Sequence, residues 1–84
     1  MFKNEMKKTR AQMCMTQEEF SERLKISLQT VKKWEQGQTL PNFDNWAQII
    51  KLMALENVAN KKLIDDYENE KGAKYDKERS TKRP

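Results

Sequence analysis

The sequence predicts an all-α fold, a compact bundle of four or five helices with a basic tail after it. Apolar residues recur at steps of three and four along most of the first 70 residues, which is the spacing of one helix face. Ser, Thr and Asn precede several of these runs, as helix caps do, and a glycine and a proline stand between later ones. A chain of 84 residues has room for one hydrophobic core, so residues 1–70 are expected to form one domain.

The first two helices are predicted from an apolar face and from a cap. The first helix spans residues 2–13, with a narrow apolar face made of Phe2, Met6, Thr9 and Met13. The second helix begins after Thr16, because Thr16 and Glu19 have the spacing of a capping box, in which each side chain bonds the other residue's backbone N–H. We place this second helix at about residues 17–24.

The third helix follows after a turn of only three residues, KIS. Ser27 is its cap, it spans about residues 28–36, and it ends at Gly37, which suits a left-handed position. Val31 and Trp34 are its inward-facing residues. A turn this short does not let two helices lie antiparallel in full contact, so the third helix is expected to cross the second with one side exposed.

Two further helices are predicted from residue 43 onward. Asn42, directly after Pro41, caps a fourth helix that is apolar on nearly all sides and should therefore lie centrally. Its apolar residues are Phe43, Trp46, Ala47, Ile49, Ile50, Leu52, Met53 and Leu55. A weaker pattern favours a fifth helix, with an acidic side opposite an apolar face made of Val58, Ala59, Leu63, Ile64 and Tyr67.

Residues 71–84 form a basic tail, for which we expect disorder. This segment lacks apolar periodicity, so the entropy cost of ordering it would exceed the gain from burial. It contains 6 Lys/Arg and 2 Asp/Glu, whereas residues 1–70 contain 11 of each. The whole net charge of +4 therefore lies in the tail.

The composition argues against several classes of protein. The chain has no histidine and a single cysteine, Cys14, so it lacks both the usual proton carrier of enzymes and the ligands of a structural zinc site. We therefore expect no enzyme activity, no metal, no cofactor and no small-molecule ligand. No apolar run approaches the roughly 20 residues that span a bilayer, so a soluble, cytoplasmic protein is expected.

Residues 16–37, TQEEFSERLKISLQTVKKWEQG, have the pattern of a helix-turn-helix. The sequence TQEE, the turn KIS, the sequence WEQG and the later Pro41 together resemble the phage repressor and Cro (XRE-type) family, over about residues 3–55. Two positions depart from the family pattern. Lys25 and Cys14 stand where the family often has glycine, and a lysine there costs some strain.

The outer side of the third helix would carry Leu28, Gln29, Lys32 and Lys33. A helix fits the major groove of DNA, where glutamine can pair with adenine, leucine can contact a thymine methyl group, and lysine can reach guanine or a phosphate. The resemblance implies that Gln29 and Lys33 face bases. The alternative for this segment is an ordinary solvated helix face.

The predicted phosphate contacts come from two segments. The first helical turn after residue 16 presents backbone N–H groups and a positive dipole end to an anion, and the resemblance implies a phosphate contact by Gln17. The full set of predicted phosphate-binding residues is Thr16, Gln17, Gln36, Gln38 and Thr39. The resemblance also implies a structural ion pair between Arg10 and Glu35.

These features predict a transcriptional regulator that binds double-stranded DNA sequence-specifically, as in phages, mobile elements and bacterial chromosomes. One small module makes few base contacts, so we expect a homodimer on half-sites about 34 Å apart, with residues 58–67 as its contact. The main alternative is a protein-binding module on the same scaffold, antitoxin-like or a phage-encoded inhibitor, which would use the acidic fifth helix. The basic tail is either a solvated end or an arm on DNA.

Overall fold

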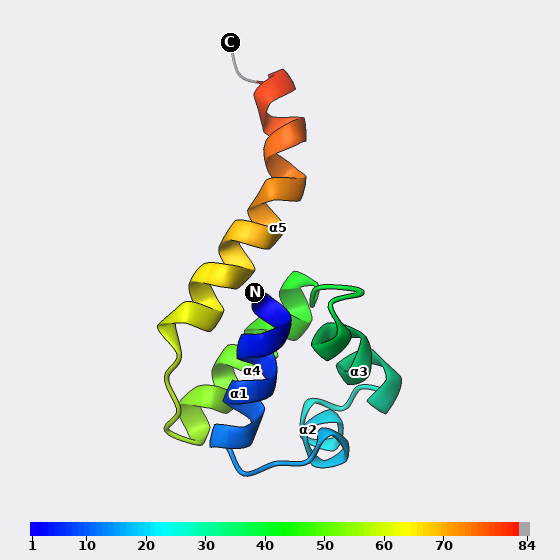
Figure 1. Cartoon of the computed structure of the whole chain (residues 1–84), viewed down its shortest axis with the longest axis vertical. Coiled ribbons are helices and arrows are strands. Elements are labelled where there is room, and N and C mark those ends of the chain that lie inside the picture. Colours follow the sequence, from blue (N-terminus) through cyan, green and yellow to red (C-terminus); the bar gives the residue numbers. More distant parts are fainter. Residues whose placement is uncertain (83–84) are drawn as a thin grey trace.

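Five helices occupy the residues that the structure describes, which confirms the predicted all-α fold. The computed structural model describes the backbone of residues 1–82 and the side chains of residues 1–72. The helices are α1 (Phe2–Gln12), α2 (Gln17–Leu24), α3 (Leu28–Gln36), α4 (Phe43–Leu55) and α5 (Lys61–Lys82). Helix α1 packs against both α3 and α5, while α2 packs against α3 and α4, and the second half of α5 extends beyond the bundle (Figure 1).

The caps of α2 and α3 form as the sequence predicts. Thr16 and Glu19 make both bonds of the capping box at the start of α2. The Ser27 side chain accepts a hydrogen bond from the backbone N–H of Thr30 and so starts α3. Gly37 ends α3 at φ 78°, a conformation that glycine adopts without the steric cost of a Cβ atom. Local sequence therefore fixes where both helices begin and end.

The core lies between the helices and draws on each of them. Its buried apolar residues are Phe2, Met6, Met13, Met15, Phe20, Val31, Trp34, Ile49, Leu52, Met53, Leu63 and Tyr67. An aromatic cluster attaches α5 to this core, because Tyr67 stacks on Trp46 with ring centroids 4.0 Å apart and lies 5.8 Å from the Phe2 ring. The Tyr67 hydroxyl also donates a hydrogen bond of 2.8 Å to the backbone carbonyl of Pro41.

Helix α4 is amphipathic, so the prediction that it lies centrally because it is apolar on nearly all sides was wrong. Ile49, Leu52 and Met53 are buried, whereas Phe43 is 57% and Leu55 69% exposed. The reason lies in the packing: α1 holds the central position between α3 and α5, which leaves α4 with one face toward the core and one toward solvent. Its apolar composition alone did not distinguish these two faces.

Helix α5 begins later than its apolar pattern suggested. Val58 and Ala59 belong to the preceding connection, and Asn60 caps the helix by accepting a 3.2 Å hydrogen bond from the N–H of Leu63. The Asn60 amide nitrogen donates to Thr9 Oγ1 at 2.9 Å and to Glu5 Oε1 at 3.2 Å. This contact fixes the start of α5 on α1 and provides a partner for the buried carboxylate of Glu5.

Residues 71–82 continue α5, although we expected them to be disordered. The expectation considered only burial, whereas Lys, Glu, Arg and Ala, which make up much of this segment, favour a helix by their intrinsic propensity. A helix that has already begun is also extended at low cost, since each added residue gains one hydrogen bond. Residues 83–84 of the predicted tail lie outside the described part of the chain.

The two positions at which glycine was expected adopt left-handed backbone conformations. Cys14, which follows α1, and Lys25, which ends α2, both have φ 58°. In this region the Cβ atom of an L-residue crowds the backbone, at a cost of roughly 1–2 kcal/mol per residue. The tight turn after α2 therefore contains local backbone strain at Lys25.

A buried ion pair joins α1 to α3. Arg10 Nε lies 2.8 Å from Glu35 Oε2, and Arg10 Nη2 lies 3.0 Å from Glu35 Oε1, so the contact has two parallel bonds. Glu35 is 1% exposed, and its hydrogen bonds with Arg10 raise the pKa of the guanidinium above its ordinary value. Arg10 Nη1 also donates to the Met15 carbonyl at 2.9 Å, so one side chain connects α1, the α1–α2 loop and α3.

Replacing Lys25 with glycine should stabilise the protein. Removing Cβ relieves the strain at φ 58°, and after the greater entropy of glycine in the unfolded chain is subtracted, a gain of about 0.5–1 kcal/mol remains. Urea unfolding of Lys25→Gly and of the control Lys25→Ala, which removes the same charge but keeps Cβ, measures this effect. Equal stability of the two variants would show that the turn carries no such strain.

Replacing Arg10 with methionine should destabilise the protein strongly. The variant leaves the Glu35 carboxylate buried without its cation, and breaking a buried pair in this way costs about 3–5 kcal/mol. The control is Arg23→Met, because Arg23 and Glu56 form a more exposed pair at 3.3 Å, for which a loss of about 0.2–1 kcal/mol is expected. Unfolding free energies from urea titration compare the two. Similar losses would contradict a special role for the buried pair.

Candidate nucleic-acid interface

The corner between α2 and α3 is built from short-range hydrogen bonds. The N–H of Ile26 donates to the Ser21 carbonyl at 3.0 Å, and the N–H of Thr30 donates to Ser27 Oγ at 3.2 Å. With Lys25 in a left-handed conformation, the chain turns sharply and α3 crosses α2. Helix α3 consequently lies at the edge of the molecule (Figure 1).

One side of α3 is anchored in the protein and the other faces solvent. Val31, Trp34 and Glu35 are at most 2% exposed. The opposite side consists of exposed Gln29, Lys33 and Gln36, which are separated by four and three residues and so form one row. Of the four residues predicted to contact bases, Gln29 and Lys33 lie in this row. Leu28 and Lys32 are only partly exposed and lie on its flank.

Within residues 1–72, the positive charge on and beside this surface has no acidic partner. Among residues 1–72, Lys25, Lys32 and Lys33 have no carboxylate within ion-pair distance. On α5, by contrast, Lys61 lies 3.6 Å from Asp65 and Lys62 lies 3.8 Å from Asp66. An anion would therefore be attracted to the α3 side of the molecule rather than to this turn of α5.

The start of α2 lies beside α3 and keeps donor groups available. The N–H of Glu19 donates to Thr16 Oγ1 at 3.1 Å, and the N–H of Thr16 donates to Glu19 Oε1 at 2.9 Å. The bonds from Thr16, the backbone one first, lower the pKa of the Glu19 carboxyl. Thr16 can still donate its hydroxyl proton, and the N–H groups of Gln17 and Glu18 precede the helical bonding pattern.

The side chain of Gln17 is held by the buried ion pair. Gln17 Nε2 donates to Glu35 Oε1 at 3.0 Å, on the same oxygen that accepts from Arg10. Three helices thus meet at one carboxylate, and the start of α2 has a fixed position relative to α3. This bond was not predictable from the sequence, because no periodic pattern relates residue 17 to residue 35.

The last residue of α3 and the loop from α3 to α4 carry the remaining predicted residues. Gln36, Gln38 and Thr39 are all exposed, and Gln38 Nε2 donates to Gln36 Oε1 at 2.8 Å. The end of this loop is attached to α5, since the Pro41 carbonyl accepts from Tyr67 and, at 3.2 Å, from Lys71 Nζ. The two glutamines and the threonine therefore lie at the end of the α3 surface, whereas Thr16 and Gln17 belong to the neighbouring start of α2.

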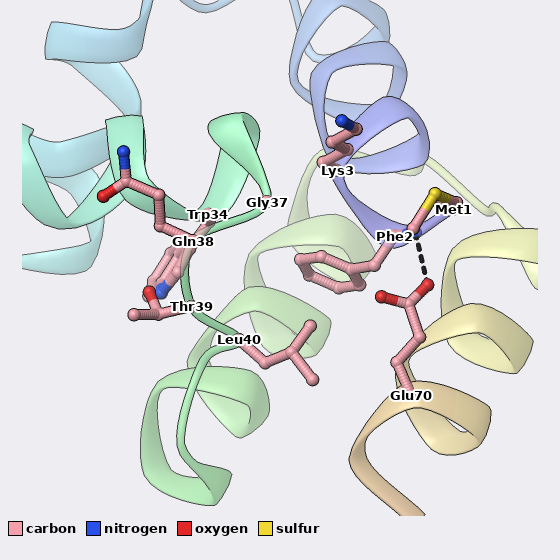
Figure 2. A pocket seen from close by; sticks show the side chains of 9 residues that line it. All are labelled: Met1, Phe2, Lys3, Trp34, Gly37, Gln38, Thr39, Leu40 and Glu70. Atoms are coloured by element: carbon pink, nitrogen blue, oxygen red, sulfur yellow. Dashed lines mark hydrogen bonds between the residues drawn. The ribbon is translucent and has the colours of Figure 1, made fainter. Parts of the chain in front are cut away.

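A cavity of about 360 Å³ lies between this loop, the start of α1 and α5. Figure 2 shows the residues that line it: Met1, Phe2, Lys3, Trp34, Gly37, Gln38, Thr39, Leu40 and Glu70. Glu70 Oε2 accepts a 2.7 Å hydrogen bond from the N–H of Phe2 and so caps α1 from a distant part of the chain. Neither Lys3 nor Glu70 was predicted from the sequence to belong to a site.

Neither a membrane-spanning helix nor a metal-binding cluster occurs in the described part of the chain. None of its helices is both long enough and apolar enough to cross a bilayer. The described side chains also contain no group of three or more His, Cys, Asp or Glu that could hold a metal ion.

The sequence matches a known protein family. A family model described as helix-turn-helix matches residues 6–56, which is more than half of the chain and includes α2 and α3 completely. No curated protein and no solved structure matches the sequence. The matched region contains the cap, the three-residue turn and the terminal glycine described above. The chain belongs to the helix-turn-helix family of the phage repressor and Cro (XRE) type, whose members are DNA-binding regulators.

Proposed function

We propose that this protein is a sequence-specific transcriptional regulator, repressor- or Cro-like, that reads the major groove of DNA with α3. The observation that carries this proposal is the contrast between the two sides of α3. Its inner side is buried and fixed by the Arg10–Glu35 pair, whereas its outer side presents amides and uncompensated ammonium groups. An ordinary solvated helix face would also be polar, so the support comes from this row together with the match of residues 6–56 to the helix-turn-helix family.

The outer row has the chemistry of base recognition. The Gln29 amide both donates and accepts, and so can pair with the N6 and N7 edge of adenine. Lys33, one turn later, can donate to guanine. Leu28 and Lys32 lie on the flank, where leucine can contact a thymine methyl group and lysine a base or a phosphate. Each of the four roles requires α3 to enter the groove.

The phosphate contacts hold α3 in register. We assign one contact to the start of α2, where the N–H of Gln17, the helix dipole and the Thr16 hydroxyl face the same solvent region. We assign a second to Gln36, Gln38 and Thr39 at the end of α3. Because Gln17 is bonded to Glu35, the first contact and the base-reading helix would move as one unit.

We further propose that the protein acts as a homodimer on two half-sites. A single module of this size contacts few base pairs, and two copies multiply the discrimination. Residues 58–67 were predicted as the dimer contact. Leu63 and Tyr67 of this segment are buried within the chain, so they are not available to contact a second subunit. Val58 and Ile64 are the larger apolar side chains of this segment that stay partly exposed.

The competing function, a protein-binding module that uses an acidic α5, has less support. Asp65 and Asp66 pair with Lys61 and Lys62 one turn earlier, which leaves this turn of α5 without a strong negative field. Beside α3, by contrast, Lys25, Lys32 and Lys33 have no ion-pair partner among the described residues. A protein-binding module should show almost no salt-dependent binding to random duplex DNA, whereas a DNA-binding protein should show it clearly.

Binding to a random-sequence DNA duplex should depend steeply on salt. Each phosphate neutralised by a cation releases counterions, so log K should fall by about 0.9 per contact for every unit of log salt concentration. We expect a slope of roughly −3 to −6 for the full chain, measured by fluorescence anisotropy of a labelled duplex over a range of NaCl concentrations. A flat response, or no binding at low salt, would overturn the proposed function.

Replacing Gln29 with alanine should relax the sequence preference at one base pair per half-site. The lost amide removes about 1–3 kcal/mol of discrimination there, with little effect on other positions. Selection of bound sequences from a random DNA library, carried out with wild type and variant, measures this change. Gln48→Ala is the matched control, since Gln48 is an exposed glutamine on α4. An identical selected motif for wild type and Gln29→Ala would refute the assignment.

A further inference from the structure

Lys3 lies where the start of α1 meets the end of α3. Its aliphatic chain covers Gly37, because a Cβ atom added at Gly37 would lie only 2.9 Å from Cδ of Lys3 and 3.8 Å from Nζ. Figure 2 shows the lysine above the glycine at the rim of the cavity. Two features of this position therefore favour glycine: its φ of 78°, and the absence of a Cβ atom that would collide with the Lys3 side chain.

The position of Lys3 extends the exposed row of α3. Gln29, Lys33 and Gly37 are spaced by four residues, so they follow one another along the same side of the helix. Gly37 itself has no side chain, and the stem of Lys3 occupies the place where one would stand. The Lys3 ammonium group, although it belongs to α1, therefore lies about one helical turn beyond Lys33 of α3.

The charge of Lys3 has no partner among the described residues. Glu70 is the carboxylate of this cavity, but it is bonded to the N–H of Phe2 at 2.7 Å, and the Lys3 ammonium points away from it (Figure 2). Lys8, on the same helix, instead lies 3.5 Å from Glu5. A partly buried stem with an uncompensated charged end is an arrangement that favours contact with an external anion.

We propose that Lys3 binds a backbone phosphate of DNA, beside the phosphate contact assigned to Gln38 and Thr39, which line the same cavity. The Lys3 ammonium supplies the charge. The contact carries no sequence information and sets how far along the groove α3 is held. This inference rests on the proposed DNA binding and adds α1 to the surface that contacts DNA.

A purely structural role for Lys3 makes a different prediction. A cation near the C-terminus of α3 interacts favourably with the helix dipole, so its loss would lower the thermal stability of the free protein. That role would leave the number of phosphates contacted unchanged. The salt dependence of DNA binding therefore separates the two roles, whereas stability alone does not.

The experiment compares Lys3→Gln with the wild type, with Lys3→Arg and with Lys8→Gln, all as full chains. The Lys8 variant loses the same charge from the same helix, at a residue already paired with Glu5. Anisotropy of a labelled random-sequence duplex is recorded across a range of NaCl concentrations, and thermal unfolding shows that each variant is folded. Random DNA is suitable because a phosphate contact does not depend on sequence.

Lys3→Gln should bind roughly three- to tenfold more weakly at moderate salt, with a slope smaller in magnitude by about 0.9 per bound subunit. Lys3→Arg and Lys8→Gln should keep the wild-type slope. If the wild type binds with a steep slope and Lys3→Gln has the same slope, the Lys3 proposal fails while the proposed function stands. If the wild type itself does not bind DNA, both fail together.

Discussion

The buried carboxylate of Glu35 is the constraint on which the rest of this structure depends. At 1% exposure, a charge requires compensation by bonds, and Arg10 from α1 and Gln17 from α2 provide them. Because Glu35 belongs to α3, these bonds fix the position of that helix relative to two others. The bonds that Glu35 needs on the inner side of α3 therefore also fix the position of its outer side.

Charge is distributed over the molecule in a way that agrees with this arrangement. At the first turns of α5, Lys61 and Lys62 pair with Asp65 and Asp66, and Asp66 also pairs with the N-terminal amine. Near α3 the ammonium groups lack such partners among the described residues. The side of the molecule that carries α3 is therefore suited to an anion.

Local signals in the sequence predicted the elements that position the site, whereas contacts between distant residues were not predictable from them. The caps at Thr16 and Ser27 and the glycine at residue 37 depend on neighbours within four residues. Glu70 caps α1 across 68 residues of sequence, and no periodicity encodes such a bond. The prediction that α4 lies centrally was wrong for a related reason, because the exposure of a helix depends on which helix occupies the centre of the bundle.

Amide-resolved NMR of the labelled protein during titration with duplex DNA shows whether DNA contacts the outer side of α3. Shift changes should concentrate at the start of α2, on the exposed row of α3 and in residues 37–39. Changes confined to α4 and the first turns of α5, with α3 unaffected, would contradict DNA contact by α3.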